Sequence, residues 1–280
     1  PKFFNINLCL DTTFAHVANY YMQMDNSELS KHAFVWIPHS TVKIHKVDSA
    51  IKAPSDYYQV RSKWEQQAID LAKTKRNVFI GYISQFMKQH LIEDYRCERG
   101  KMIDCTNGLN RNDKRFTNKI PQQKIRRVLQ NYNIPTEKSL IVSFGRLEVY
   151  KGFDFTIKVG GRLAQNGFVT VLIAQPYKKN DPIIKKTLKL FEKYNPTGIF
   201  IYDYQFNLPH LILQWLKTRI LLVPSKAEPF GLIPEEVRFH NYPNLSLVVA
   251  NRQGFLEQVT DGKDGFMIDV ANIETAYKKI

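Results

Sequence analysis

Short apolar runs alternate along this chain with longer stretches in which apolar residues recur every three or four positions. The short runs predict buried strands at residues 6–10, 33–37, 78–83, 140–144, 170–173, 198–202, 220–223 and 245–250. The longer stretches predict helices at residues 14–24, 57–74, 85–95, 122–132, 153–166, 183–194, 208–217 and 234–239. Such alternation builds parallel sheets covered by helices, so the pattern predicts an α/β fold with doubly wound, Rossmann-like sheets.

One polar, charged segment interrupts this alternation. Residues 110–119 read NRNDKRFTNK, which favours a linker. A boundary there gives a partial first domain, residues 1–112, and a fuller second domain, residues 113–280. Ligands of doubly wound sheets bind beyond the carboxyl ends of the strands, so the chemistry is expected in the loops that follow them.

Composition narrows the class of protein. Hydrophobic residues make up 44% of the chain and aromatic residues 12%, which is enough to build packed cores. The three cysteines lack the close spacing of a disulfide framework or zinc site and fit a reducing cytosol. No apolar run approaches the ~20 residues of a membrane-spanning helix. A cytoplasmic protein without a disulfide framework or a zinc site is therefore expected.

The formal net charge of +14 indicates either a lysine-rich solvated surface or an anionic partner. Nucleic acid is the weakest candidate partner, because no zinc-finger, homeodomain or RNP-type signature accompanies the charge. An anionic small substrate and a peripheral contact with the inner face of an anionic membrane both stay open.

The loop after the strand at residues 140–144 combines two glycines with two cations. It reads GRLEVYKG from Gly145 to Gly152. The glycines permit a tight turn and a close backbone approach. Arg146 and Lys151 precede a helix whose N-terminus already favours anions. These groups predict a diphosphate site; the alternative is a surface loop whose cations only pair with carboxylates such as Glu148.

The loop after the strand at residues 220–223 carries carboxylates. It reads PSKAEPFGLIPEE and ends at Glu236. Glu228 lies in the loop, and Glu236 lies in the first turns of the next helix. A carboxylate accepts paired hydrogen bonds from vicinal hydroxyls, as acidic residues do with ribose. Acidic residues also favour helix N-termini for structural reasons alone, which is sufficient to explain Glu235.

Together the two motifs resemble glycosyltransferase family 4, whose members have the two-domain GT-B fold. The seven residues between Glu228 and Glu236 match the E-x7-E signature of that family. Residues 83–88, 107–110 and 251–266 resemble further segments of it. His39 is similar to a histidine that faces the donor sugar, although a capping or core histidine is an equally simple interpretation.

The resemblance implies two Rossmann-like domains that face a cleft, with the acceptor bound on the first and the donor on the second. It implies a retaining, hexosyltransferase-type enzyme that uses a nucleotide-diphosphate sugar, with UDP favoured, and neither a metal nor another cofactor. The acceptor is unidentified. The residues implied in the reaction are Arg146, Lys151, Glu228 and His39. The residues implied in donor binding are Gly145, Phe230, Gly231, Leu232 and Glu236.

The chain also departs from the family. Ala174, Gln175 and Pro176 replace a glycine-rich turn, and segments expected at both ends are missing, which indicates a first domain that is incomplete. Three alternatives remain open. They are another GT-B enzyme (a phosphorylase or an epimerase), a non-catalytic GT-B-like scaffold, and a basic nucleic-acid-binding protein.

Overall fold

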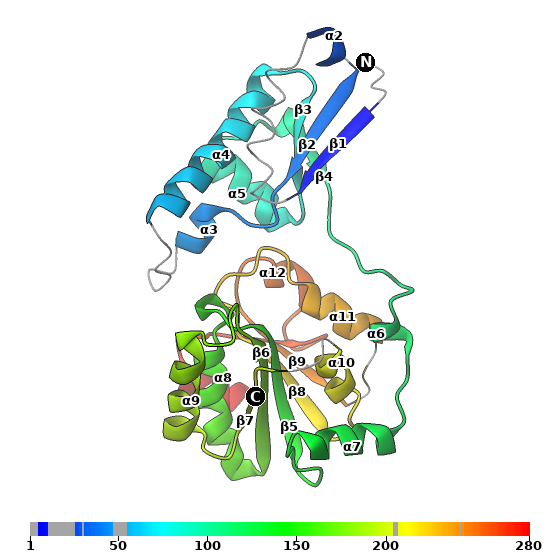
Figure 1. The fold of residues 1–280 in the computed structure, drawn as a ribbon, viewed down its shortest axis with the longest axis vertical. Helices are drawn as coiled ribbons and strands as arrows, with labels where there is room; N and C mark the ends of the chain where they lie inside the picture. Colours follow the sequence, from blue (N-terminus) through cyan, green and yellow to red (C-terminus); the bar gives the residue numbers. More distant parts are fainter. Residues whose placement is uncertain are drawn as a thin grey trace. The chain divides into compact units, whose positions relative to one another are not determined.

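The computed structural model describes residues 5–10, 26–29, 31–46, 55–203, 207–240, 242 and 244–280. The chain divides into two compact units (Figure 1). Unit 1 comprises Pro1–Gly108 and the short segment Ala227–Phe230, and unit 2 comprises Leu109–Lys226 and Gly231–Ile280. The two units divide between Gly108 and Leu109, and the domain boundary expected after residue 112 stays a prediction.

Unit 1 is built on a four-stranded parallel sheet in the order β1-β2-β3-β4. Its strands are β1 (Asn5–Leu10), β2 (His32–Ile37), β3 (Val78–Tyr82) and β4 (Met102–Asp104). Its helices are α2 (Asn26–Leu29), α3 (Val42–Lys46), α4 (Ser55–Thr74), α5 (Gln85–Tyr95) and the 3-10 turn η2 (Arg99–Lys101). The three-residue strand β4 was not predicted, and the helix predicted at residues 14–24 lies outside the described residues.

A buried carboxylate fixes the segment that follows β2. Glu65 of α4 is fully buried, and its two oxygens lie 3.1 and 3.2 Å from the backbone nitrogen of Val42, which starts α3. Arg61 donates to the same carboxylate at 3.0 Å, and Tyr95 of α5 donates a further hydrogen bond to it. Burial raises the pKa of Glu65, and these donors offset part of the cost of burying it. The carboxylate therefore ties α3, α4 and α5 together.

Unit 2 contains a six-stranded parallel sheet in the order β10-β9-β8-β5-β6-β7. Its strands are β5 (Ser139–Arg146), β6 (Phe168–Gln175), β7 (Ile199–Ile201), β8 (Thr218–Val223), β9 (Ser246–Ala250) and β10 (Phe266–Ile268). The chain starts in the middle of the sheet at β5 and builds outward through β6 and β7. It then returns to β8, on the other side of β5. The strand order therefore reverses between β5 and β8, and such a switch point is where doubly wound sheets bind ligands.

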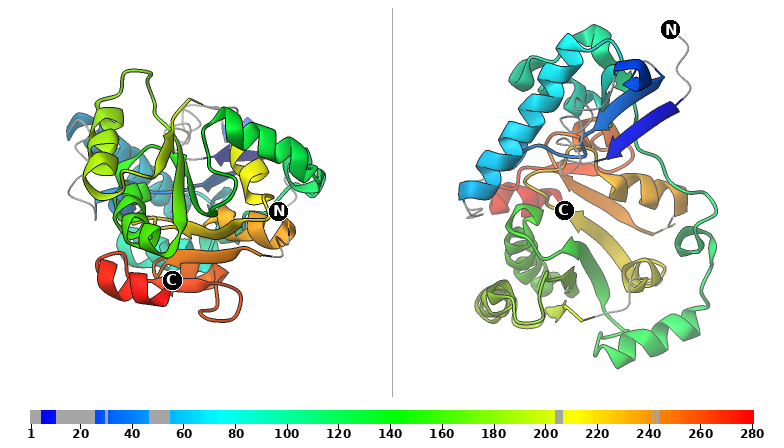
Figure 2. Two further views of the ribbon diagram at one scale, coloured as in Figure 1. Left: turned by 90° about the horizontal axis from the view of Figure 1, so that it is seen from below. Right: turned by 45° about the horizontal axis from the view of Figure 1, so that its top comes forward.

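Helices cover both faces of this sheet (Figure 2). Successive side chains of a strand point to opposite faces. Leu140 and Val142 of β5 pack in a core with residues of α7, α10 and α12, while Ile141 packs with residues of α8 and α13. The helices are α6 (Lys114–Thr117), α7 (Gln122–Asn131), α8 (Phe153–Leu163), α9 (Pro182–Tyr194), α10 (Leu208–Leu213), α11 (Leu232–His240), α12 (Phe255–Gln258) and α13 (Ile273–Lys279). The remaining 3-10 turns are η3 (Val149–Lys151) and η4 (Ala164–Asn166).

Most predicted elements are present with shifted ends. α10 stops at Leu213, four residues before the predicted end, because a turn closed by the backbone nitrogen of Thr218 leads into β8. α11 begins at Leu232, two residues before the predicted start, since Pro234 in the first turn requires no intrahelical donor. The predicted linker contains α6. Asp113 caps the N-terminus of α6 by accepting a hydrogen bond from the backbone amide of Arg115. β10 was missed.

Gly152 is expected to be irreplaceable for the stability of unit 2. Its φ of +69° disfavours any L side chain, and a Cβ there would lie 2.1 Å from the carbonyl oxygen of Pro224. Gly152→Ala should therefore lower the free energy of unfolding by about 3 kcal/mol or more, measured by urea denaturation. Gly167→Ala is the matched control: φ is +82° but no atom lies within 4 Å, so only about 1–2 kcal/mol should be lost. Equal losses would contradict the role of the close approach.

Candidate functional site

The loops after β5 and β8 interlock at the switch point of the sheet. Gly152, at the start of α8, lies against the end of β8 through Pro224. The backbone nitrogen of Lys226 donates to the carbonyl of Tyr150 at 2.7 Å, and its ammonium lies 3.4 Å from the Asp154 carboxylate. Backbone and side-chain contacts thus hold the two predicted motifs against each other.

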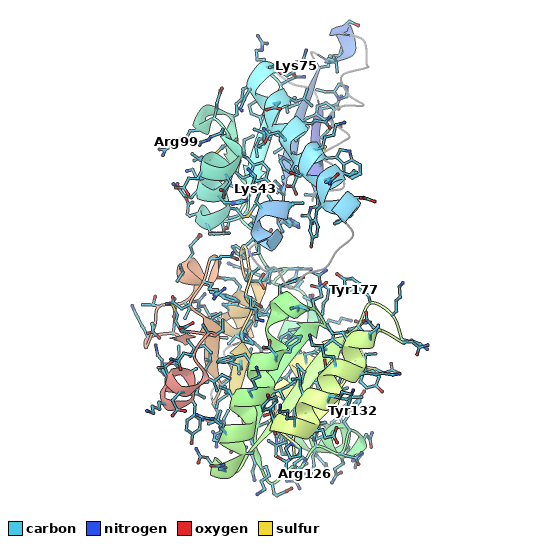
Figure 3. All side chains as sticks on the ribbon, turned by 90° about the vertical axis from the view of Figure 1, so that its left-hand side faces the viewer. Lys43, Lys75, Arg99, Arg126, Tyr132 and Tyr177 are labelled. Carbon is cyan, nitrogen blue, oxygen red and sulfur yellow. The ribbon has the colours of Figure 1, made fainter. Side chains whose placement is uncertain are left out.

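Arg146 ends β5 and stays accessible, with 62% of its side chain exposed. Its Nη2 donates to the Tyr150 hydroxyl at 2.7 Å, and its Nη1 donates to the Tyr177 hydroxyl at 3.2 Å. Oε1 of Glu148 lies 3.4 Å from Nη1, so the pairing with Glu148 weighed from the sequence is present. Tyr177 comes from the loop between β6 and α9 (Figure 3).

Lys151 is the last residue of η3, directly before Gly152 and the first turn of α8. Its ammonium lies 5.4 Å from the centre of the Tyr150 ring. The carboxylate of Asp154 pairs with Lys158 at 3.9 Å and with Lys226. The end of β5 therefore carries two cations, Arg146 and Lys151, beside a helix N-terminus, and the carboxylate of Glu148 partly offsets the charge of Arg146.

Glu236 projects from α11 into a mostly buried setting, with 14% of its side chain exposed. Burial raises the pKa of this carboxyl to about 7; the nearby Arg115 opposes the rise, and Asp113 adds to it. Nε2 of His210 lies 3.9 Å from Oε2 of Glu236, which is beyond hydrogen-bond distance. Burial, together with Arg115 and His240, lowers the pKa of His210 to about 4. The imidazole is therefore neutral near pH 7, and the two groups do not form an ion pair.

A cavity of about 270 Å³ lies next to this group, between the segment that contains α6 and helix α10. Its walls include Asp113, Arg115 and His210, which also surround Glu236. A polar ligand in this cavity would therefore lie close to that carboxylate. The cavity is lined by Asp113, Lys114, Arg115, Asn118, Ile120, Asn207, His210, Leu211 and Gln214.

The predicted site residues fall into two groups. Six of them belong to unit 2: Gly145, Arg146, Lys151, Gly231, Leu232 and Glu236. Glu228 and Phe230 belong to the segment grouped with unit 1, and His39 lies exposed beyond the end of β2 in the same unit.

The two adjacent glutamates of α11 differ in their surroundings. Glu235 is 39% exposed and pairs with Arg238 at 3.2 Å, one helical turn away, so a structural role accounts for it. Glu236 is the one that is buried beside His210 and Arg115.

Several groups around the site were missed from the sequence. Tyr177 could have been found, because it follows β6 at the same edge of the sheet as Arg146. Glu148 was noted only as a competing partner. His210 and Arg115 belong to no recognised motif. They lie beside Glu236 only because α10 and the segment before α7 pack against α11.

Two further features concern only the described part of the chain. No group of three or more histidine, cysteine, aspartate or glutamate side chains gathers there in a way that could hold a metal ion. No described helix is both long enough and apolar enough to cross a membrane.

The two parallel sheets, of four and six strands, have the α/β architecture of the GT-B fold. The family model of "Glycosyl transferases group 1" matches residues 124–280. The chain therefore belongs to that family, as its motifs predicted.

Individual relatives agree with this assignment. An uncharacterised 41.2 kDa protein of the Klebsiella pneumoniae cps region is 28% identical over 57% of this chain and 40% of its own length. Granule-bound starch synthase 1 of Arabidopsis thaliana is 28% identical over 50% of this chain and 22% of its own length. The chain thus spans less than half the length of these curated relatives.

Solved structures share the fold at low sequence identity. Sucrose-phosphate synthase from Thermosynechococcus elongatus gives a TM-score of 0.75 at 14% identity, covering 98% of this chain and 63% of that protein. Anabaena HepE in complex with UDP and glucose gives a TM-score of 0.71 at 17% identity, covering 97% of this chain and 66% of HepE.

The buried Glu236 should cost stability in a pH-dependent way. Its carboxyl has a pKa of about 7 when folded against 4.5 as its ordinary value. The folded chain therefore holds this proton more tightly, so stability falls as pH rises from 4.5 and the full cost is present above about 7. Glu236→Gln should remove up to roughly 3 kcal/mol of that cost at pH 8.5, as measured by urea denaturation.

The same substitution should stabilise the chain little at pH 4, where both folded and unfolded carboxyls hold their protons. Comparing variant and wild type at each pH cancels the titration of all other groups. An equal gain at pH 4 and pH 8.5 would show that the effect does not come from the charge.

Proposed function

We propose that the intact protein transfers a sugar from a nucleotide-diphosphate donor to an acceptor hydroxyl with retention of the anomeric configuration. The observation that carries this proposal is the position of two motifs at adjacent strands. The cations Arg146 and Lys151 follow β5, the carboxylate of Glu236 follows β8, and the strand order reverses between these two strands. Groups suited to a diphosphate and a group suited to a ribose therefore follow neighbouring strands at one edge of the sheet.

Each half of the donor has a chemical counterpart in unit 2. Arg146, Lys151 and the N-terminus of α8 suit the diphosphate, because charge-assisted hydrogen bonds and helix ends both favour phosphate. Glu236 suits the two ribose hydroxyls, which donate to a carboxylate. The amides of Gly231, with φ +91°, and of Leu232 suit a phosphate or sugar oxygen.

The reaction breaks the bond between the anomeric carbon and the terminal phosphate oxygen and forms a bond to the acceptor oxygen. Arg146 and Lys151 stabilise the negative charge that develops on the departing diphosphate, an electrostatic contribution worth about 3–4 kcal/mol for one such contact. In the retaining route, the acceptor attacks from the leaving-group face and its proton passes to the departing phosphate. Glu228 and His39 are proposed to hold the sugar hydroxyls.

UDP is the favoured donor nucleotide, and this part of the proposal is supported by relatives. HepE is described in complex with UDP and with UDP-glucose, and the trehalose-phosphate synthase of Burkholderia xenovorans is described as UDP-forming. A hexose is the matching sugar.

Titration calorimetry of the whole chain with UDP, GDP and ADP tests the donor site. One nucleotide should bind near one-to-one stoichiometry. Arg146→Ala and Glu236→Ala should each weaken it by about 10- to 100-fold, because each removes hydrogen bonds between a charged group and the ligand.

Arg162→Ala is the matched control. Arg162 is an exposed arginine at the C-terminal end of α8, away from Gly152, and it pairs with Glu274 of α13. Its loss should therefore leave nucleotide affinity unchanged. If folded chain binds none of the three nucleotides, the donor-site proposal fails and a non-catalytic scaffold becomes the better account.

Donor binding should weaken as pH falls below about 7. Glu236 then gains a proton and loses acceptor capacity for the ribose hydroxyls. UDP-glucose is the suitable probe, because its doubly esterified diphosphate does not titrate in this range. Its affinity should decrease several-fold between pH 8 and pH 5.5. Glu236→Gln should bind weakly with no such pH dependence, and a wild-type affinity independent of pH would contradict the ribose contact.

A further inference from the structure

Three side chains from two loops surround the guanidinium of Arg146. Glu148 and Tyr150 belong to the loop after β5, and Tyr177 belongs to the loop after β6. The Tyr177 hydroxyl donates to Oε1 of Glu148, and the same hydroxyl accepts from Nη1 of Arg146 at 3.2 Å. Tyr150 accepts from Nη2 at 2.7 Å. Glu148, Tyr150 and Tyr177 form an arginine cradle.

The cradle leaves part of the guanidinium available to a ligand. A guanidinium has five N–H donors. Among the described residues, the contacts of Arg146 engage three of these donors: two on Nη1 and one on Nη2. Because 62% of the Arg146 side chain is exposed, the remaining two donors can reach a phosphate without breaking the cradle.

The position of the Glu148 carboxylate is unfavourable for the stability of the folded chain. Its side chain is only 9% exposed, and its Oε2 is buried without a hydrogen-bond partner among the described residues. Such an oxygen costs about 1–3 kcal/mol. The carboxylate also offsets one of the two cations at the end of β5. The first effect lowers stability, and the second lowers the positive charge available to a phosphate. Buried polar groups that lower stability in this way are concentrated at functional positions.

Both effects are explained if Glu148 holds the Arg146 side chain in its binding conformation before the donor arrives. A free arginine side chain loses up to ~2 kcal/mol of conformational entropy when it is ordered. If the cradle orders Arg146 before the donor arrives, that loss no longer weakens binding. The sequence departure after β6 fits the same role: where a glycine-rich turn was expected, Pro176 supplies no N–H, and the hydroxyl of Tyr177 reaches the arginine instead.

We propose that Glu148 and Tyr177 are positioning residues that hold Arg146 for the terminal phosphate of the donor. This assignment rests on the proposed function, and it predicts that the cradle affects the terminal phosphate specifically. The informative quantity is therefore the ratio of the UMP to the UDP dissociation constant, which a general loss of folding would not change selectively.

Calorimetric titration of the full chain with UDP and UMP tests the tyrosine. Tyr177→Phe should reduce the UMP-to-UDP ratio by about tenfold while UMP affinity stays within about twofold of wild type. Tyr194→Phe, which removes a tyrosine hydroxyl at the far end of α9, is the matched control and should leave both affinities unchanged.

The glutamate is tested by a pair of variants. Glu148→Ala should reduce the ratio at least as much as Tyr177→Phe, because both the hydrogen-bond acceptor and the ion pair are lost. Glu148→Gln keeps an acceptor oxygen for Tyr177 and Arg146 and removes the offsetting charge, so it should restore the ratio to the wild-type value or above. Glu192→Ala on the exposed face of α9 serves as control.

The outcomes separate the two proposals. If wild type binds UDP but the ratio is unchanged in Tyr177→Phe and Glu148→Ala, the positioning role is wrong and the donor site stands. If Glu148→Gln fails to restore what Glu148→Ala loses, the acceptor role assigned to Glu148 is wrong. If wild type binds no nucleotide diphosphate, the donor site itself is wrong and the positioning role falls with it.

Discussion

The carbonyl oxygen of Pro224 lies where a side chain on residue 152 would begin, 2.1 Å from the ideal Cβ position. This contact brings the end of β8 against the start of α8. It allows Lys226 to donate to the Tyr150 carbonyl and to pair with Asp154. The candidate donor site depends on it, because Arg146 and Lys151 follow β5 whereas Glu236 follows β8.

The net charge of this site is limited by an ion pair and by burial, which disfavours the charged forms of its titratable groups. Glu148 sits beside Arg146, and burial keeps His210 neutral while it raises the pKa of Glu236 to about 7. A site of this kind holds few uncompensated charges before the donor arrives. The same burial that prepares Glu236 for hydroxyl groups makes it unfavourable for stability, so function and stability oppose each other at one residue.

The sequence predicted what depends on local pattern and on motif order. Strand and helix positions followed from apolar periodicity, and the two motifs identified the family. Helix ends near Pro234 and Thr218 shifted because tertiary turns override periodicity. The strands β4 and β10 gave no signal because their apolar runs are only two and three residues long, whereas β7 lies within the longer run of residues 198–202. The surroundings of Glu236 could not be predicted, since His210 and Arg115 reach it only through the packing of α10 and of the segment that begins at Asp113. Tyr177 is 29 residues from Glu148 in sequence, and the pairing of β5 with β6 brings their loops to the same edge of the sheet.

The central claim is that the edge formed by β5 and β8 binds a nucleotide-diphosphate sugar. A structure of the chain with bound UDP or UDP-glucose tests it most directly. The account predicts the terminal phosphate within hydrogen-bond distance of Arg146 and Lys151, and the ribose hydroxyls against Glu236. A nucleotide bound elsewhere, or one bound here with its phosphates turned away from both cations, would contradict it.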